Sequence, residues 1–460
     1  MSKYNRLGAS FRDPSGFLFS YKGEIYRQIN QSYQEDFNHL IESGLYDNLV
    51  QSGMLITHQE VDLEPPQREV AYKIIKPQRL LFISYPYEWC FSQLKDAALL
   101  TLEIQKRALK HGLSLKDSSA YNIQFHHGRP ILIDSLSFER YIEERPWVAY
   151  RQFCQHFLAP LSLMAFTDVR LSQLLRVQID GIPLDLASKL LPWKTWFNFS
   201  LLTNIHLHAA AQARYADEQI NLKSTEQKMG LTSLLGLIDS LETSIRNLKW
   251  SPKDTTWGDY SSFHNYTPAA IDHKRQILND YLEKIHPTSV YDLGANVGTF
   301  SRLASTKGIP TLAFDFDPGA VEINYLQCLQ EGETNLLPLL MDLTNPSPGI
   351  GWQNEERLSL MARSSADAVL ALALIHHLLI SNNLPFEHLA SFFAQLGRWL
   401  VIEYIPKSDP QAQKLLASRE DIFLNYTPQV FESVFSERYK IHHSTEIHES
   451  DRILYLMERK

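Results

Sequence analysis

The stretch that most constrains the fold is residues 290–300, which read Val-Tyr-Asp-Leu-Gly-Ala-Asn-Val-Gly-Thr-Phe. An apolar run reaches Asp292 and then meets Gly294 and Gly298, two and six residues further on. Glycine permits positive φ and leaves no Cβ between the main chain and a ligand. The stretch therefore predicts a strand at 289–293 that turns sharply into a helix, with a ligand seated on the turn.

A second apolar segment follows at residues 310–316 and contains Asp315 near its end. It predicts a parallel strand, and the resulting βαβ unit places an acid where it can bind a ribose. The run Asp292-Leu-Gly294-Ala-Asn-Val-Gly298 resembles motif I of class I S-adenosylmethionine-dependent methyltransferases, and Phe314-Asp315-Phe-Asp317-Pro resembles their second motif. The resemblance implies an α/β fold with a Rossmann-like sheet that binds S-adenosyl-L-methionine. The cofactor-binding residues would be Asp292, Gly294, Asn296, Gly298, Asp315 and Asp342.

A dinucleotide-binding enzyme is the competing interpretation of this loop. Dinucleotide sites usually carry G-x-G-x-x-G, in which the middle glycine clears the pyrophosphate. This chain has Asn296 at that place. Asp292 beside the loop would suit a diphosphate badly, but it would suit the cationic, phosphate-free methionine end of the methyl donor. The residues therefore favour a methyltransferase.

The segments that follow supply the other elements of such a sheet. We expect a helix at 319–330, strands at 335–341, 367–373 and 400–404, a helix at 427–435, and a closing antiparallel hairpin at 439–443 and 453–457. In the methyltransferases that the chain resembles, an acid at the place of Asp342 commonly hydrogen-bonds the adenine amino group. A solvent-exposed turn residue is the other interpretation of Asp342.

Two histidines follow the fourth strand, at the carboxyl edge where open α/β sheets bind ligands. Imidazole titrates near neutral pH, so His376 or His377 is expected to take the proton of the acceptor, an oxygen or nitrogen nucleophile. Glu403, in the fifth strand, is a further candidate base. The methyl group of S-adenosylmethionine is already activated by the sulfonium that carries it. The protein therefore mainly has to align the acceptor.

The second informative stretch, residues 115–134, contains Asp117, Asn122 and Asp134 at spacings of five and twelve. It resembles the catalytic core of the kinase and aminoglycoside-phosphotransferase superfamily. There the first Asp orients the acceptor hydroxyl, while the Asn and the second Asp hold magnesium. The alternative function is therefore a magnesium-dependent phosphotransferase or a nucleotide-binding regulatory protein.

That pattern is incomplete in this chain. Leu115-Lys116 stands where His-Arg is usual, Ser135-Leu136 stands where Phe-Gly is usual, and no glycine-rich phosphate loop precedes them. Lys73 is the candidate nucleotide lysine. Asp and Asn residues around a hairpin also serve turns and local hydrogen bonds, and these three residues need not carry catalysis. The other interpretation of this stretch is therefore a module that binds a ligand without transferring phosphate.

The N-terminal region is predicted to be an α+β kinase-like module completed by a helical lobe. We expect a hairpin at 17–29, a helix at 33–53, a strand at 79–85, a helix at 91–111 and mostly helices from 147 to 248. Aromatic residues between 250 and 266 either pack in the core or form a lid over the donor or the acceptor. The predicted domains are 1–145, 146–250 and 251–460.

Composition narrows the function and the compartment. The 460 residues carry a formal charge of -8 with no dense Lys/Arg run, which disfavours a nucleic-acid substrate. The three cysteines form no C-x-x-C, and His206 and His208 do not share a helical face, so neither a disulfide framework nor a metal site is predicted. The most apolar stretch, 368–380, is shorter than a membrane span, and a soluble cytoplasmic protein is expected.

The layout of the whole chain resembles a bacterial family of two-module methyltransferases that includes nodulation-protein-like members. The segments 86–89, 406–409 and 419–423 carry this resemblance together with the stretches at Asp117 and Asp292. We expect the N-terminal module to be a catalytically inactive binding platform that presents a small-molecule or glycan acceptor to the C-terminal site. The acceptor and the oligomeric state do not follow from the sequence.

Overall fold

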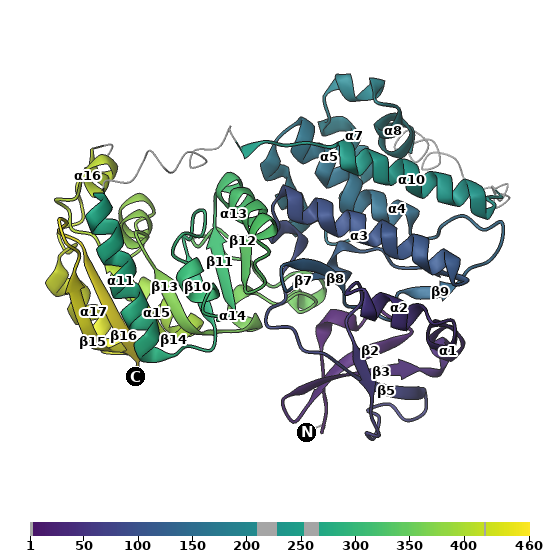
Figure 1. The fold of residues 1–460 in the computed structure, drawn as a ribbon, viewed down its shortest axis with the longest axis horizontal. Helices are drawn as coiled ribbons and strands as arrows, with labels where there is room; N and C mark the ends of the chain where they lie inside the picture. The colour runs from purple at the N-terminus through teal and green to yellow at the C-terminus, as the bar shows by residue number, and fades with distance from the viewer. Residues whose placement is uncertain (1–2, 209–227, 253–265, 418–419) are drawn as a thin grey trace. The chain divides into compact units, whose positions relative to one another are not determined.

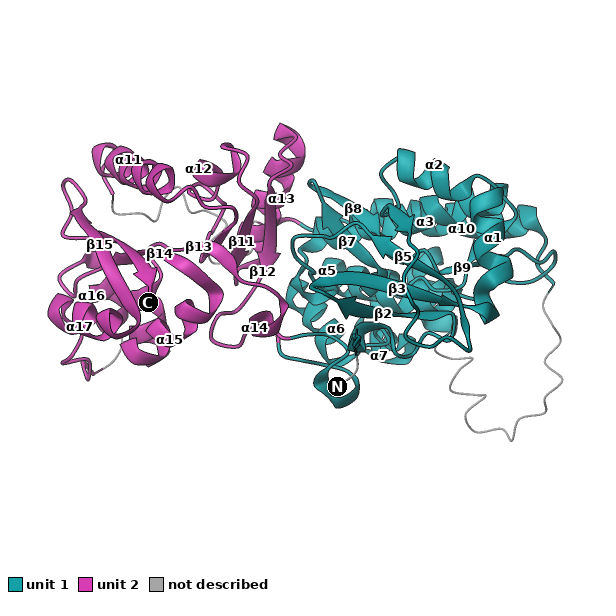
Figure 2. Cartoon of the chain, turned by 90° about the horizontal axis from the view of Figure 1, so that it is seen from below, with its two compact units in different colours: residues 1–250, 348–358 teal, residues 251–347, 359–460 magenta. Residues whose placement is uncertain are grey.

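The computed structural model describes residues 3–208, 228–252, 266–417 and 420–460. The chain divides into two compact units, which Figure 2 shows in different colours. Unit 1 contains residues 1–250 and 348–358, and unit 2 contains residues 251–347 and 359–460. Most of the predicted aromatic lid lies outside the described residues, namely Trp257, Tyr260, Phe263 and His264.

The described part of unit 2 is built on a seven-stranded sheet in the order β12-β11-β10-β13-β14-β16-β15. The central strand β10 (Val290–Leu293) pairs in parallel with β11 (Thr311–Asp315) on one side and β13 (Ala366–Ala371) on the other. The chain order therefore reverses between β10 and β13, which makes their carboxyl ends a topological switch point. The outer strands are β12 (Leu336–Leu340), β14 (Gly397–Tyr404), β15 (Tyr439–Glu446) and β16 (Ile453–Arg459).

The last two strands confirm the predicted closing hairpin. β16 runs antiparallel to β14 and to β15, whereas β10 to β14 are mutually parallel where they pair. Parallel strands need crossover connections, and helices supply them here. Unit 2 is therefore a doubly wound α/β sheet with an antiparallel edge.

Helices cover both faces of this sheet (Figure 2). On one face lie α11 (Pro268–Ile285) and α12 (Arg302–Ser305), which share a hydrophobic core with β10. On the other lie α15 (Phe386–Leu396) and α17 (Pro428–Arg438), where the rings of Phe431 and Tyr455 have centroids 5.1 Å apart. The remaining helices described in unit 2 are α13 (Pro318–Glu331), α14 (Leu360–Arg363) and α16 (Pro410–Leu416).

Side-chain caps fix where these helices begin. The Thr267 hydroxyl accepts from the Ala270 N–H (3.1 Å) to start α11, and Asp317 accepts from the Gly319 N–H (2.7 Å) to start α13. A proline follows each cap, in the first turn, where its missing N–H is no loss. The second methyltransferase-like motif thus supplies both the end of β11 and the cap of the next helix.

The described residues at the start of unit 1 form an antiparallel five-stranded sheet in the order β1-β2-β3-β5-β4 (Figure 1). Its strands are β1 (Asn5–Arg6), β2 (Gly16–Tyr21), β3 (Glu24–Asn30), β4 (His58–Glu60) and β5 (Ala71–Pro77). β2 and β3 are the predicted hairpin, and its turn at Lys22 and Gly23 has φ of 52° and 81°. Positive φ at both central residues suits the right-handed twist of the strands.

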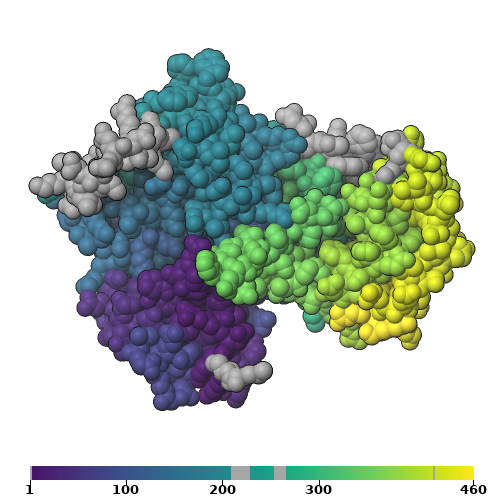
Figure 3. All heavy atoms as spheres, turned by 180° about the vertical axis from the view of Figure 1, so that it is seen from behind, coloured from purple at the N-terminus to yellow at the C-terminus, as the bar shows by residue number. Residues whose placement is uncertain are grey.

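Two short antiparallel pairs follow, β6 (Leu113–Leu115) with β9 (Phe138–Arg140) and β7 (Ile123–His126) with β8 (Arg129–Leu132). Figure 3 shows the first residues of unit 1 as purple spheres and its later residues as blue to teal spheres. The helices described in unit 1 are α1 (Gln34–Glu42), α2 (Leu45–Gln51), α3 (Phe91–Lys110), α4 (Tyr150–Phe153), α5 (Ala159–Phe166), α6 (Leu174–Val177), α7 (Leu184–Leu190), α8 (Phe199–Leu201) and α10 (Leu231–Asn247).

Three predicted elements differ from the structure. The helix expected at 33–53 is divided into α1 and α2 by Gly44, whose φ of 75° is left-handed and interrupts a helix. Residues 79–85 form no strand, because Leu81 and Ile83 are exposed instead of packing in a sheet. The helix expected directly after the strand at 289–293 is the single turn of α12, which begins only at Arg302.

Residues 348–358, which lie between β12 and β13 in sequence, belong to unit 1. Glu356 accepts a hydrogen bond from Arg12 Nε (2.7 Å), and the Leu358 carbonyl accepts one from the Tyr85 hydroxyl (3.2 Å). The sequence predicts one domain from 251 to 460, whereas the structure assigns this segment to unit 1, because its polar partners come from the N-terminal part of the chain.

Candidate functional site

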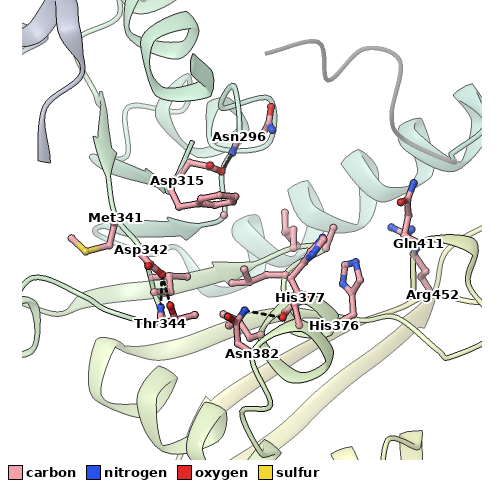
Figure 4. Close-up of a pocket in the computed structure, with 18 of the residues that line it drawn as sticks. Asn296, Asp315, Met341, Asp342, Thr344, His376, His377, Asn382, Gln411 and Arg452 are labelled. Carbon is pink, nitrogen blue, oxygen red and sulfur yellow. Dashed lines mark hydrogen bonds between the residues drawn. The ribbon is translucent and has the colours of Figure 1, made fainter. Parts of the chain in front are cut away.

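A cavity of about 450 Å³ lies at the carboxyl ends of the central strands of unit 2 (Figure 4). Its lining includes Gly294 after β10, Asp315 at the end of β11, Asp342 after β12 and His376 after β13. The order of the strands brings these residues together although they lie far apart in sequence. The cavity therefore occupies the place where sheets of this kind bind ligands.

Gly294 forms the floor of the cavity just beyond β10. Its φ is 76°, a value that side chains with a Cβ seldom adopt. A Cβ built at Gly294 would stand 3.1 Å from Cδ1 of Leu374, and both residues line the cavity. The absence of a side chain here keeps the main chain open to a ligand, as the sequence predicted.

Gly298 packs closely against its neighbours. It is not part of the cavity lining that the structure describes. A Cβ at Gly298 would come within 2.5 Å of the Asn324 amide and 2.7 Å of the Arg302 guanidinium. The second glycine of the motif therefore lets the turn pack closely against α13.

Asp315 is the central acid of the site. Its carboxylate accepts hydrogen bonds from the N–H groups of Asn296 (2.7 Å) and Asp317 (3.0 Å), which hold it at the end of β11. Burial raises the pKa of Asp315 to about 6, and the backbone N–H groups oppose this rise. The carboxylate is therefore mostly ionised at pH 7, and it lines the cavity beside Asn296.

The two other predicted acids lie in different surroundings. Asp292 is buried, accepts a hydrogen bond from the Ser301 hydroxyl (2.6 Å) and is not part of the described lining. This hydrogen bond braces the start of the helix after β10. Asp342 lines the cavity but is exposed, and it accepts from the N–H (2.8 Å) and hydroxyl (2.7 Å) of Thr344 in a turn.

His376 and His377 both line the cavity, with ring centroids 4.1 Å apart. His376 is 2% exposed, and its Nδ1 has no hydrogen-bond partner in the structure. Burial lowers the pKa of His376 well below its ordinary value, and the positive charges of Arg452 and Lys274 lower it further. The imidazole is therefore neutral at pH 7.

Glu403 is buried below the cavity and does not belong to its described lining. Its carboxylate accepts hydrogen bonds from Lys274 Nζ (2.7 Å), from the Ala373 N–H (2.8 Å) and from the Tyr266 hydroxyl. Burial alone would raise the pKa of Glu403, but the charges of Lys274 and Arg452 outweigh it and hold the pKa below its ordinary value. These contacts leave Glu403 unsuited to act as a base.

A second acid completes this buried network. Asp409 accepts from Nε of Arg452 at 2.7 Å and from its NH2 group at 3.1 Å, and Arg452 also donates to the Tyr266 hydroxyl (2.7 Å). Tyr266 and Arg452 line the cavity. The network thereby ties α11, the end of β14, the cap of α16 and the start of β16 to one wall of the site.

Sequence reasoning missed this network. One partner of the network could have been found from the sequence. Lys274 lies on the buried face of α11 with Ala270, Ile277 and Leu278. A lysine on an apolar face indicates a buried anionic partner. Its partner Glu403 belongs to a distant strand, and no local spacing connects the two.

The Asp117 stretch of unit 1 uses its polar groups for local contacts. Asp117 accepts from the Ser119 N–H (2.9 Å) and from Gln152 Nε2 (2.8 Å). Asn122 donates to the Ser137 hydroxyl (3.3 Å). Lys73 donates to Glu60 on the neighbouring strand (2.7 Å).

Asp134, the residue expected to hold magnesium, is paired with an arginine. Its Oδ1 accepts from Arg27 NH1 (2.7 Å), while Arg27 NH2 donates to Asp13 (2.6 Å). The Arg27 side chain is only 8% exposed. A guanidinium thus supplies the positive charge at the carboxylate where a metal ion would supply it in a phosphotransferase.

Replacing Arg27 by alanine is expected to destabilise unit 1 by roughly 3 to 5 kcal/mol, because breaking a buried ion pair leaves uncompensated charge. The exposed Arg68, which pairs with Glu64 four residues away, is the control and should lose less than about 1 kcal/mol. Hydrogen exchange of the β2 and β3 amides in denaturant measures the loss of stability in both variants. Equal losses in the two variants would contradict the structural role of Arg27.

Within the described residues, no group of three or more His, Cys, Asp or Glu side chains is placed to hold a metal ion. The described helices likewise include none that is both long enough and apolar enough to cross a membrane.

No protein-family model matches the sequence. Among solved structures, magnesium protoporphyrin IX methyltransferase (ChlM) from Synechocystis PCC 6803 with bound SAH is similar over 44% of this chain and 93% of its own, at 13% identity and a TM-score of 0.32. The bifunctional kinase-methyltransferase WbdD is similar over 42% of this chain and 40% of its own, at 17% identity and a TM-score of 0.29.

A curated protein matches the chain over almost its whole length. It is the nodulation protein NoeA of Rhizobium meliloti (strain 1021), which is 34% identical over 462 aligned residues. The alignment covers 99% of this chain and 96% of that protein. The chain therefore belongs to the family of the nodulation protein NoeA.

Proposed function

We propose that the chain is a methyltransferase that uses S-adenosyl-L-methionine and transfers its methyl group to an oxygen or nitrogen nucleophile. The observation that carries the proposal is the cavity at the switch point, where Gly294 and Asp315 line one part and His376 another. The residues present fit this cofactor. The turn has no Cβ at Gly294, the donor part of the cavity is acidic, and nothing in it resembles a phosphate cradle.

Each described residue has a distinct task in this proposal. The backbone at Gly294 and Asn296 supports the nucleoside, Asp315 accepts from the ribose hydroxyls, and Asp342 lies on the adenine side. The carboxylates also favour a cationic ligand, because opposite charges attract strongly where water is partly excluded. When bound, S-adenosylmethionine supplies a methyl group on an activated sulfonium. His376 accepts the proton of the nucleophile, and His377 packs beside it.

For unit 1 we propose a binding role, in which it presents a small-molecule or glycan acceptor to unit 2. The NoeA relative, which aligns over 96% of its length, supports the view that both units act as one protein. We do not propose phosphoryl transfer, because Asp134 is paired with Arg27 and Lys73 with Glu60.

Donor affinity is expected to fall about tenfold per pH unit below pH 6. Burial raises the pKa of Asp315 to about 6, so its carboxylate is charged at pH 7 and becomes protonated as the pH falls through 6. The protonated acid no longer attracts a sulfonium. Calorimetry with S-adenosylmethionine between pH 5 and 8 measures this dependence.

Two matched variants show which acid of the cavity, Asp315 or Asp342, causes the pH dependence of donor binding. Asp315→Asn should bind the donor weakly and with little dependence on pH, whereas Asp342→Asn should keep the dependence of the wild type. The assignment of Asp315 fails if wild-type affinity is constant from pH 8 to 5, or if Asp342→Asn is the variant that abolishes the dependence.

A further inference from the structure

The part of the cavity away from Asp315 and Asp342 has its own chemical character. Figure 4 shows Gln411 and Arg452 on the opposite side of the two histidines from those acids. We call this part the acceptor half, and its described lining is Tyr266, His376, His377, Gln411 and Arg452. If the proposed function holds, the nucleophile must lie here.

From this lining we infer that the acceptor is an uncharged hydroxyl compound, an alcohol, phenol or sugar, whose O–H donates to the imidazole of His376. The inference rests on the proposed function. It goes further by selecting oxygen over nitrogen and a neutral acceptor over an acid.

The first support is the balance of charge around the acceptor half. Arg452 is its one described cation, and the guanidinium is already committed to Asp409 at 2.7 and 3.1 Å and lies 3.5 Å from Glu403. Lys274 beneath it is paired with Glu403 at 2.7 Å. Two positive and two negative side chains, each less than 10% exposed, therefore cancel one another.

This balance disfavours charged acceptors of either sign. A carboxylate or phosphate would lose hydration without gaining an uncommitted cation among the described residues. An amine would arrive as an ammonium ion, and no carboxylate belongs to the described lining of the acceptor half. Burying an unpaired charge is far more unfavourable than burying a hydroxyl that makes a hydrogen bond.

The second support is His376, whose side chain lines the cavity. Its Nδ1 is closed off from the cavity and has no partner in the structure, so a ligand meets the ring at its other nitrogen. A neutral imidazole accepts a hydrogen bond at its unprotonated nitrogen, which suits a hydroxyl donor.

The geometry also accounts for the proton that a neutral acceptor must lose. The acceptor oxygen forms a bond to the methyl carbon while the carbon–sulfur bond breaks, and the bonding pair remains on sulfur. The hydroxyl proton passes to the imidazole of His376 and then to water. The product is a neutral ether, and one proton is released for each methyl group transferred.

The first test needs no methyl donor. In protein with ¹⁵N-labelled histidine, glycerol should shift the imidazole ¹⁵N resonances of His376, and sodium acetate or phosphate at equal ionic strength should not. Asp409→Asn, which frees part of the Arg452 guanidinium, should gain a response to acetate. A shift with an anion in the wild type, or with none of the probes, would overturn the inference.

The second test reads the chemistry of the product. A small-molecule and glycan extract of the producing cells is incubated with methyl-labelled donor, and the product is expected to be neutral and stable to mild alkali. Labelled methanol released by alkali indicates an ester, and label retained on a cation exchanger indicates an amine; either result overturns the inference. Failure of the proposed function itself would appear separately, as absence of S-adenosylhomocysteine binding.

Variants assign the base. His376→Gln should lower transfer by about 100-fold or more, the usual contribution of a general base, and should leave S-adenosylhomocysteine affinity within about twofold. His388→Gln, at an exposed position on α15 outside the cavity lining, is the matched control and should retain most of the activity. Equal losses in both variants, or lost donor binding in His376→Gln, would contradict the role of His376.

Discussion

Glu403→Gln is expected to destabilise unit 2 by roughly 3 to 5 kcal/mol, the usual loss when one partner of a buried ion pair is removed. Glu403 is fully buried, and Lys274, its partner at 2.7 Å, is 1% exposed. The variant leaves the Lys274 ammonium without its anion and weakens the anchor of the Ala373 N–H. Hydrogen exchange of β13 and β14 in increasing denaturant measures the change.

Two controls show whether charge is the cause. Glu446→Gln, at an exposed position on β15, should change the free energy of unfolding by less than about 0.5 kcal/mol. Adding Lys274→Met to Glu403→Gln should recover about 1 to 3 kcal/mol, the range of coupling between contacting residues. If the double variant is no more stable than Glu403→Gln alone, uncompensated charge is not what destabilises the protein.

Gly294→Val should abolish measurable donor binding, a loss of at least roughly 100-fold or about 2.7 kcal/mol. The φ of Gly294 is 76°, where a β-branched residue is strongly disfavoured. Its Cβ would stand 3.1 Å from Leu374 Cδ1, and the rest of the side chain would enter the space proposed for the donor. Calorimetry with S-adenosylhomocysteine measures the loss.

Gly308→Val separates this effect from backbone strain. Gly308 has a similar φ of 79°, but a Cβ there meets nothing within 4 Å. It should lose stability through the same strain and still bind the donor product within about twofold of the wild type. Loss of binding in both variants would mean that strain, and not the shape of the cavity, explains the result at Gly294.

The strands of unit 2 were predictable because each carries its signal locally. An apolar run that ends in an acid or a glycine turn identifies β10 and β11, and caps such as Asp317 identify the next helix. The hairpin at Lys22-Gly23 was predictable for the same reason. Gly44 shows the limit, because a single left-handed residue divides a helix whose apolar spacing looks continuous.

The site was predictable only in part. The sequence correctly placed Asp315, Asp342 and the histidines at one edge of the sheet, since parallel strands end together. It did not separate Asp292, which is buried under the turn, from the residues that line the cavity.

Contacts between distant segments were beyond the reach of the sequence. The Lys274–Glu403 pair joins a helix to a strand, and the Arg12–Glu356 contact places residues 348–358 in unit 1. Neither leaves a periodic signal, because each depends on which elements become neighbours after folding.

The central claim is that the cavity beyond β10 holds a sulfonium nucleoside. Calorimetry of the full-length wild type with S-adenosylmethionine, S-adenosylhomocysteine and NAD tests it most directly. We predict one molecule of S-adenosylmethionine per chain, displaced by S-adenosylhomocysteine and unaffected by NAD. Binding of NAD at this cavity, or of none of the three ligands, would contradict the account.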